Sequence, residues 1–312
     1  MQFKFKVLIK SNLTAMLLLI LMVVLCYFSA KNFLLSNQKN MSEESFNQCC
    51  QMSDSFKVLI ENIIYSTVTQ PDFAEIIENT EFQSLIIDKL EAIRAMNLNI
   101  VGVHLYTYGN DISYNSGRFS SFYSLGDYTA IDNYREFLDS EAKSAWLYNN
   151  VDGDKLIFVS KIKSEGRDIG FVQTDVMLDT FLGFFDVDNN RSGSDTFAYY
   201  SAGDELIHRG NADEHEGLTR DILEMITFNK SGETTSDGSG FLFCQRFIPD
   251  NLYIVKLESL DAFYRNMDML KIIFAVVALL ILAVINVLYY RLIGRMTESL
   301  RSLREKIRSY HY

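Results

Sequence analysis

The chain has 312 residues, a formal net charge of −11 and 48% hydrophobic residues. This length allows one large domain or two small ones, and only two prolines exclude a long proline-rich linker. Because the acidic surplus lies between two basic ends, the central region is not expected to bind nucleic acid.

Two uncharged apolar runs, residues 11–30 and 272–290, lie near the ends of the chain. Each is about as long as a helix that crosses a bilayer. The first run is longer than the apolar part of a cleaved signal peptide, so we expect two membrane helices. Basic residues dominate the tail 1–10 and the segment 291–312, which predicts cytoplasmic termini and an extracytoplasmic region 31–271.

Residues 31–70 are predicted to form a stalk helix that continues out of the first membrane helix. Apolar residues recur in it at three-four spacing, which indicates one buried helical face. The stripe consists of Phe46, Cys49, Cys50, Phe56, Ile60, Ile63 and Ile64. Pro71 is expected to end the helix, because the residue before a proline avoids the helical region.

The central region reads as two successive α+β modules, a membrane-distal one at 71–185 and a membrane-proximal one at 186–259. In the first we expect helices within 73–97, strands at 101–108 and 111–116, a loop at 117–130, a helix at 133–144, strands at 146–148, 155–163 and 167–176, and a helix at 177–185. In the second we expect strands at 197–202, 205–209, 240–247 and 252–258 and a helix at 218–228. An exit helix at 260–271 leads into the second apolar run.

Beyond that run, apolar residues recur at heptad spacing, which favours a coiled coil between two chains. These residues are Leu292, Met296, Leu300, Leu303, Ile307 and Tyr310. We interpret them as a signalling helix in a parallel homodimer.

Cysteines and histidines do not form a recognisable metal or disulfide framework. The adjacent Cys49 and Cys50 leave two possibilities, free thiols or a cross-link between two chains of a dimer. Residues 186–193 suggest a calcium loop, but Arg191 and Phe197 stand where such a loop has glycine and a bidentate acid. The four histidines do not fall at metal-ligand spacing, so we expect neither a metal nor a cofactor.

This order of elements resembles the double Cache sensor domain of bacterial transmembrane receptors. The resemblance implies an α+β fold, in which two membrane helices flank a long stalk helix and two tandem PAS-like antiparallel-sheet modules. It extends most closely to the input half of Firmicute-type sensor histidine kinases or of membrane-anchored AraC-type regulators. Residues 156–162 and 166–175 resemble the paired strands that end the family's distal module. Residues 296–303 are similar to the start of a HAMP linker, although Ser299 stands where that linker has proline.

The resemblance also implies a ligand pocket in the distal module. In amino-acid-binding members an Arg-x-Trp pair and a later Asp hold the ligand's carboxylate and ammonium. Here Trp146 and Asp175 match the Trp and the Asp, while Ser144 stands at the arginine position. A serine cannot hold a carboxylate with two parallel hydrogen bonds, so a sugar, a polyol or another small metabolite is expected instead of an α-amino acid.

Three further residues are candidates for the pocket. Tyr106 and Tyr148 are included because aromatic side chains dominate ligand sites, and Arg135 is a candidate counter-charge for Asp175. Simpler structural roles stay open: Trp146 as a core aromatic, Asp175 as a helix cap and Arg135 as a solvated helix residue.

These features favour extracytoplasmic small-molecule sensing, with ligand binding in the distal module shifting the second membrane helix. The alternatives are a membrane-anchored scaffold or assembly protein and, less favoured, an ectoenzyme. The sequence contains no glycine-rich phosphate loop and no nucleophile elbow, so no enzymatic activity is expected in the residues present. The expected partners are a small molecule, the lipid bilayer and a second copy of the chain.

Overall fold

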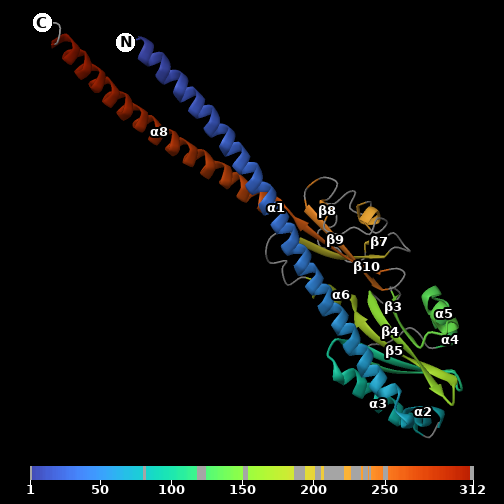
Figure 1. Ribbon diagram of the computed structural model, residues 1–312. Helices are drawn as coiled ribbons and strands as arrows, with labels where there is room; N and C mark the ends of the chain where they lie inside the picture. Colours follow the sequence, from blue (N-terminus) through green and yellow to red (C-terminus); the bar gives the residue numbers. More distant parts are fainter. Residues whose placement is uncertain are drawn as a thin grey trace. The chain divides into compact units, whose positions relative to one another are not determined.

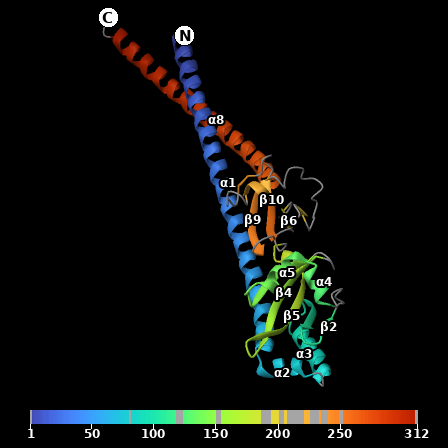
Figure 2. The same cartoon turned by 90° about the vertical axis from the view of Figure 1, so that its right-hand side faces the viewer.

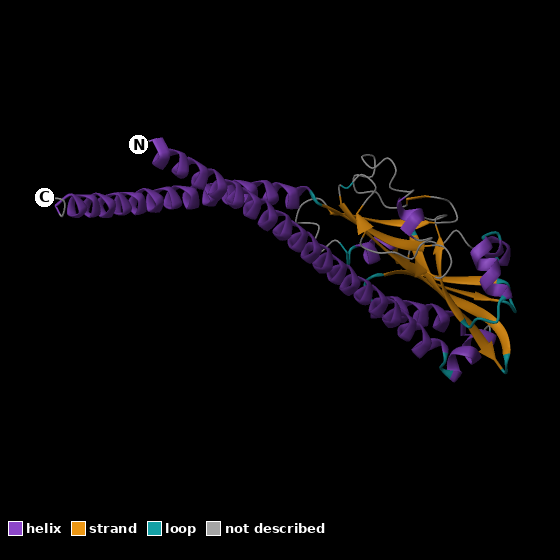
Figure 3. Ribbon diagram, turned by 45° about the horizontal axis from the view of Figure 1, so that its top comes forward, coloured by secondary structure: helices purple, strands orange, loops and turns teal. Residues whose placement is uncertain are grey.

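The computed structural model describes residues 2–79, 82–117, 124–149, 154–185, 194–200, 205–206, 221–225, 233–234, 238, 240–248 and 252–309. The chain divides into two compact units, residues 1–40 with 260–312, and residues 41–259. All the described strands belong to the second unit, and the described part of the first is helical except for the residue before its second helix (Figure 3). The fold is therefore α+β, as predicted.

Two long helices, α1 (Gln2–Val68) and α8 (Asp261–Ser309), supply the helical unit. Both are long and apolar enough to cross a membrane. Within this unit the ring of Tyr27 lies edge-on to Phe274, with 6.5 Å between ring centroids. Helix α1 is uninterrupted, so the first apolar run and the predicted stalk belong to one helix.

The predicted signalling residues lie on the C-terminal part of α8. Leu292 and Met296 are exposed, which leaves them accessible to a partner. The structure describes the backbone of Leu300, Leu303 and Ile307 but not their side chains, and Tyr310 lies outside the described residues. Pairing of two chains through this helix stays a prediction.

Each module of the second unit is built on one antiparallel sheet. The first sheet contains β1 (Ile100–Thr107), β2 (Ile112–Gly117), β3 (Ser144–Asn149), β4 (Lys155–Ser164) and β5 (Arg167–Met177), in the order β2-β1-β5-β4-β3. The second contains β6 (Ser194–Tyr200), β7 (Glu205–Leu206), β8 (Glu233–Thr234), β9 (Gly240–Ile248) and β10 (Leu252–Ser259), in the order β7-β6-β10-β9-β8. Because both sheets follow the same strand order, one topology occurs twice in tandem.

Helices cover both faces of the first sheet. Residues 41–68 of α1, together with α2 (Pro71–Glu78) and α3 (Gln83–Met96), lie against one face, and the short helices α4 (Leu125–Thr129) and α5 (Asp132–Asp139) lie against the other (Figures 1 and 2). For brevity we call these the α1 face and the α5 face. Both faces are buried.

The predicted apolar stripe of the stalk is confirmed as core. Its members are buried except for Ile63, which is half-buried. Phe46 stacks on Phe243 of β9, with ring centroids 5.6 Å apart, and Phe56 meets Phe181 edge-on at 5.1 Å. Helix α1 thus packs against residues of both modules.

The cysteines on this stripe do not favour a cross-link between chains, one of the two possibilities that the sequence leaves open. Neither Cys49 nor Cys50 forms a disulfide in this structure, and the two residues have exposed fractions of 7% and 6%. Burial, together with the charge of Asp54, raises the pKa of Cys50 to about 12. In this conformation neither thiol is accessible to a second chain, because the packing that forms the core also encloses the sulfur atoms.

Three helix predictions need correction. Residues 125–129 were expected in a loop but form α4, because Ser124 and Asp127 make a capping box at its start. Helix α5 ends at Asp139, and Ser144, expected in the helix, already begins β3. The segment expected at 177–185 shortens to α6 (Leu178–Leu182).

Two further predictions fall partly or wholly on residues that the structure does not describe. Of the helix expected at 218–228, only residues 221–225 are described, and these are helical. The calcium-like segment 186–193 lies outside the described residues.

Candidate functional site

Polar side chains gather on the α5 face of the first sheet, where three strands meet. His104 of β1 lies opposite Gln173 of β5, and Asp175 follows two residues later on the same face. Lys155 of the adjacent strand β4 reaches this carboxylate. All four are almost fully buried, with exposed fractions of 1%, 1%, 3% and 5% for His104, Gln173, Asp175 and Lys155. We call these four residues the polar cluster.

Both carboxylate oxygens of Asp175 already have partners within the protein. Gln173 Nε2 donates a hydrogen bond to Oδ1 at 2.5 Å. On the other oxygen, Oδ2, converge His104 Nε2 at 3.3 Å and Lys155 Nζ at 3.6 Å. This explains how a charge can be buried in an apolar sheet, since an isolated buried carboxylate would be very costly.

Two further residues extend the cluster. The hydroxyl of Tyr134 on α5 donates a hydrogen bond to Gln173 Oε1 at 2.7 Å. The second ring nitrogen of His104, Nδ1, lies 2.8 Å from Asn115 Oδ1 on β2. The cluster therefore joins the sheet to the helix that covers it.

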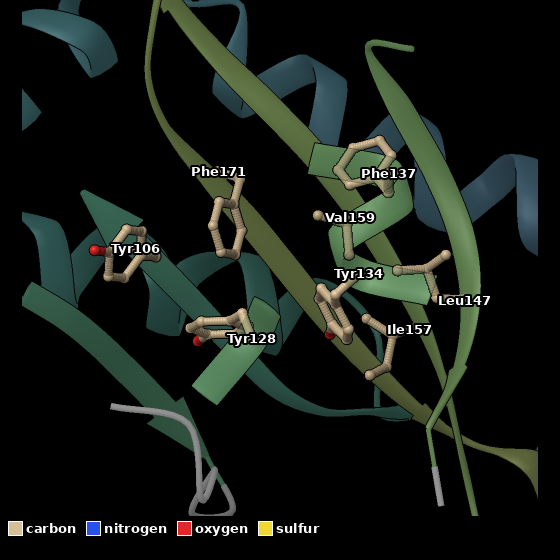
Figure 4. Close-up of a cluster of buried hydrophobic side chains, with 8 residues drawn as sticks. All are labelled: Tyr106, Tyr128, Tyr134, Phe137, Leu147, Ile157, Val159 and Phe171. Carbon is tan, nitrogen blue, oxygen red and sulfur yellow. The ribbon is translucent and has the colours of Figure 1, made fainter. Parts of the chain in front are cut away.

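An aromatic cluster fills the rest of this face (Figure 4). It is formed by Tyr106, Tyr128, Tyr134, Phe137, Leu147, Ile157, Val159 and Phe171. The ring of Tyr106 stacks on Phe171 with 5.3 Å between centroids, and its hydroxyl donates to Asp111. Burial and this hydrogen bond raise the pKa of Tyr106 above its ordinary value, so its hydroxyl stays protonated and can donate.

The structure brings two of the predicted site residues to this face. Asp175 is the centre of the polar cluster. Tyr106 shares the face but lies further along β1, opposite Phe171, where the aromatic cluster surrounds it. Its ring is 2% exposed, so it contributes to packing around the polar cluster.

Trp146 lies on the opposite, α1 face, so the structure does not bring it together with Asp175. Its indole Nε1 donates a hydrogen bond to Glu61 Oε1 of α1 at 2.8 Å. The ring packs against Phe158 and Phe181 at centroid distances of 5.3 and 5.8 Å. Side chains alternate along β3, so Leu147 takes the α5 face and the sheet separates Trp146 from Asp175.

Tyr148 and Arg135 are also away from the polar cluster. Tyr148 shares the α1 face with Trp146, where its hydroxyl donates to Asp154 Oδ1 at 2.7 Å and its ring lies 5.1 Å from Tyr200 of β6. Arg135 is exposed on α5 and pairs with Asp132 on the same helix. It is therefore a helix-surface residue and not a counter-charge for Asp175.

Sequence reasoning missed His104, Lys155, Gln173 and Tyr134 as site residues. A signal was present, because Gln173 and Asp175 are polar residues at alternate positions in the buried part of β5, residues 170–176. Two polar side chains on one face of a buried strand need partners nearby. The partners, Lys155, Tyr134 and His104, lie 20, 39 and 71 positions earlier, and strand pairing and helix packing bring them to this face.

Within the described residues, no group of three or more His, Cys, Asp or Glu side chains could hold a metal ion. The polar cluster combines one carboxylate with a lysine, an imidazole and an amide. This set combines hydrogen-bond donors and acceptors with charges of both signs.

Comparison with known proteins finds likeness at the level of structure. No protein-family model and no curated protein matches the sequence. The sensory domain of the Campylobacter jejuni chemoreceptor Tlp3 matches with a TM-score of 0.53 and 13% identity over 75% of this chain and 97% of that one. The extracellular domain of the putative histidine kinase vpHK1S-Z8 matches with a TM-score of 0.54 and 8% identity, over 72% and 92% of the two chains.

A domain of a putative sensory box/GGDEF family protein from Vibrio parahaemolyticus also matches, with a TM-score of 0.54 and 8% identity over 72% of this chain and 97% of that one. Identities this low make the likeness one of fold. The part of this chain that matches, 75% of its length, contains two tandem α+β modules beside a long N-terminal helix and has the fold of Cache-type sensory domains.

Proposed function

We propose that this chain is a two-pass receptor of a bacterial plasma membrane that senses a small molecule outside the cell. Residues 31–271 are extracytoplasmic in this proposal, and both termini are cytoplasmic. The observation that carries it is the buried polar cluster around Asp175, in the distal module of a sensory-domain fold. A structural neighbour, the Tlp3 ligand-binding domain, was crystallised in complex with L-valine, which supports a ligand in this fold.

Binding at the polar cluster would act on three strands directly, because His104, Lys155 and Asp175 belong to β1, β4 and β5. On the other face of the same sheet, Trp146 and Ser144 of β3 contact Glu61 and Tyr65 of α1. Helix α1 also carries the first apolar run. In this proposal, a displacement of the sheet is transmitted through these contacts to α1 and so to the first membrane helix.

The second connection runs through the chain itself. Strand β10 ends at Ser259, and α8, which carries the second apolar run, begins at Asp261. A ligand shifts such a system only through different affinities for two conformations. The signal then passes to the segment 291–312, in a parallel homodimer with a HAMP-like linker, as in the input half of a sensor kinase or a membrane-anchored AraC-type regulator.

A melting experiment on the full chain in detergent tests this function. A panel of sugars, polyols, organic acids and amino acids is added, and unfolding is followed by circular dichroism. At a hundredfold excess over its Kd, a ligand stabilises the folded state by about 2.7 kcal/mol, which raises Tm by roughly 5–10 °C.

Two variants locate the site. Gln173→Leu removes the amide that links Asp175 to Tyr134 and should remove the ligand-induced shift. Lys161→Met is the matched control, because Lys161 is buried on the same sheet face but donates to the carbonyls of Leu138 and Ser140 and lies over the Phe137 ring, outside the polar cluster. A panel without any effect, or a shift that survives Gln173→Leu, contradicts the proposed site.

A further inference from the structure

Phe181 lies where the distal module, residues 71–185, meets the proximal module, residues 186–259. It belongs to α6, which begins directly after β5. Its side chain is fully buried. The ring meets Phe56 of α1 edge-on at a centroid distance of 5.1 Å, and it meets Phe247 of β9 edge-on at 5.0 Å. One side chain of the distal module thus contacts both α1 and the proximal sheet.

The partner ring, Phe247, lies at an irregularity of β9. The register of β9 against β10 shifts at this residue, because Ile248 and Arg246 pair with consecutive residues of β10. A bulge of this kind bends the strand and redirects a side chain. The carbonyl oxygen of Phe247 accepts a hydrogen bond from Lys57 Nζ of α1 at 3.1 Å, and the same ammonium group lies over the ring. The ring that meets Phe181 is therefore held in place by α1 as well.

Further aromatic contacts cross the same joint. Phe46 of α1 packs against Phe185 of the distal module and against Phe243 of the proximal module, both at 5.6 Å. Tyr148 of β3 lies 5.1 Å from Tyr200 of β6. The three phenylalanines are at most 1% exposed, so the joint is as buried as a domain core. Two modules are expected to move relative to one another unless their interface is large and apolar, and an apolar interface is what these contacts build.

From this joint we infer that the two modules move and unfold as one cooperative unit, and that Phe181 is the side chain that couples them. Strand β5, which carries Asp175, leads directly into α6, and β9 pairs with β10, the strand that leads into α8. A shift of β5 thus reaches the proximal sheet through Phe181 and Phe247, in addition to the route along α1. The inference goes beyond the sensing function, because the coupling exists with or without a ligand.

Hydrogen exchange of the full chain in detergent, measured peptide by peptide, tests the coupling. Ile157→Val makes a small defect in the aromatic cluster on the α5 face, on the other side of the sheet from the joint. Such a truncation raises the equilibrium constant for opening by about two- to tenfold. In one cooperative unit, the most protected amides of β4, β9 and β10 all gain this same factor. A response confined to the peptides of the distal module overturns the inference.

The same measurement on a Phe181→Leu background tests the role of this side chain. Leucine keeps the site apolar but removes the ring that meets Phe247. Ile157→Val should then still raise exchange in β4, but its effect in β9 and β10 should be clearly smaller. If the two modules still respond equally, α1 is sufficient to join them and the role assigned to Phe181 is wrong.

Phe158→Leu is the matched control. Phe158 is also buried on the α1 face, where its ring packs against Trp146 at 5.3 Å and Tyr65 at 5.8 Å, and neither of these belongs to the proximal module. This variant should lower Tm, but β9 and β10 should respond to Ile157→Val as fully as in the unmodified chain. If Phe158→Leu uncouples the modules as well, any core defect does so, and Phe181 has no special role.

A double-mutant cycle measures the contact between Phe181 and Phe247 directly. Phe181→Leu, Phe247→Leu and the double variant are unfolded in urea, and the unfolding equilibrium constants are compared. Because an edge-on aromatic pair is equivalent to about a two- to tenfold change in an equilibrium constant, the effect of the double variant should fall short of the product of the single effects by that factor. Single effects that multiply without a shortfall contradict the coupling. Phe247→Leu also replaces Phe181→Leu in the exchange experiment if the latter variant does not fold.

Discussion

The hydrogen bond between Trp146 and Glu61 fixes strand β3 of the distal module to helix α1, and Trp146→Phe removes it while keeping an aromatic ring. Trp146 Nε1 lies 2.8 Å from Glu61 Oε1, in a partly buried position, and the ring packs against Phe158 and Phe181. A hydrogen bond to a charged group contributes about 1.5–3 kcal/mol. The smaller ring also loses part of its packing, so we expect a loss of about 2 kcal/mol in the free energy of unfolding.

For a unit of this size, about 2 kcal/mol corresponds to a fall of about 4–8 °C in Tm. Unfolding of the full chain is followed by circular dichroism, because the variant loses the only tryptophan of the sequence. Glu61→Gln is the matched variant, since the amide oxygen can still accept the bond without charge, and its loss should be about 1 kcal/mol or less.

The relative size of the two Tm effects tests the assigned hydrogen bond. A Tm of Trp146→Phe equal to that of the unmodified chain, or a larger effect of Glu61→Gln than of Trp146→Phe, would refute the assigned bond. In the unmodified chain, this single indole also reports on the α1 face by its fluorescence. A ligand that acts through β3 on α1 should therefore change the emission of Trp146 although it binds on the other side of the sheet.

Three further predictions follow from the packing. Gly170→Ala should lower stability by more than about 2 kcal/mol, because a Cβ there would lie 2.1 Å from Tyr106 O, whereas Gly109→Ala meets nothing within 4 Å and should be neutral in the same melting assay. Burial raises the pKa of the Cys50 thiol from 9.0 to about 12, so its contribution to stability is complete below pH 9 and is lost as pH rises toward 12. The Tm of Cys50→Ala should therefore fall less steeply with pH above 9 than the Tm of the unmodified chain, and an equal fall would contradict the assignment. Lys57→Met should cost about 0.5–1.5 kcal/mol, because Lys57 Nζ donates to Phe247 O at 3.1 Å and lies over the Phe247 ring, and an unchanged Tm would show that this contact contributes nothing.

The sequence by itself determined those elements whose residue pattern is compatible with only one kind of secondary structure and one buried face. A run of about twenty uncharged apolar residues is compatible with a membrane helix, and the stripe from Phe46 to Ile64 could be buried only along one helical face. Alternation along β1 placed Val103 and Leu105 on one side and His104 and Tyr106 on the other, and strand pairing agrees. The tandem α+β arrangement followed from these patterns.

The tertiary structure decided which side of each strand meets which helix. Both faces of the first sheet are buried, so the alternation in β3 could not tell whether Trp146 or Leu147 shares a face with Asp175. The capping box of α4 likewise depends on a single turn and gives almost no periodic signal. The polar cluster joins residues from β1, β4 and β5, and only strand register brings His104, Lys155 and Asp175 into contact.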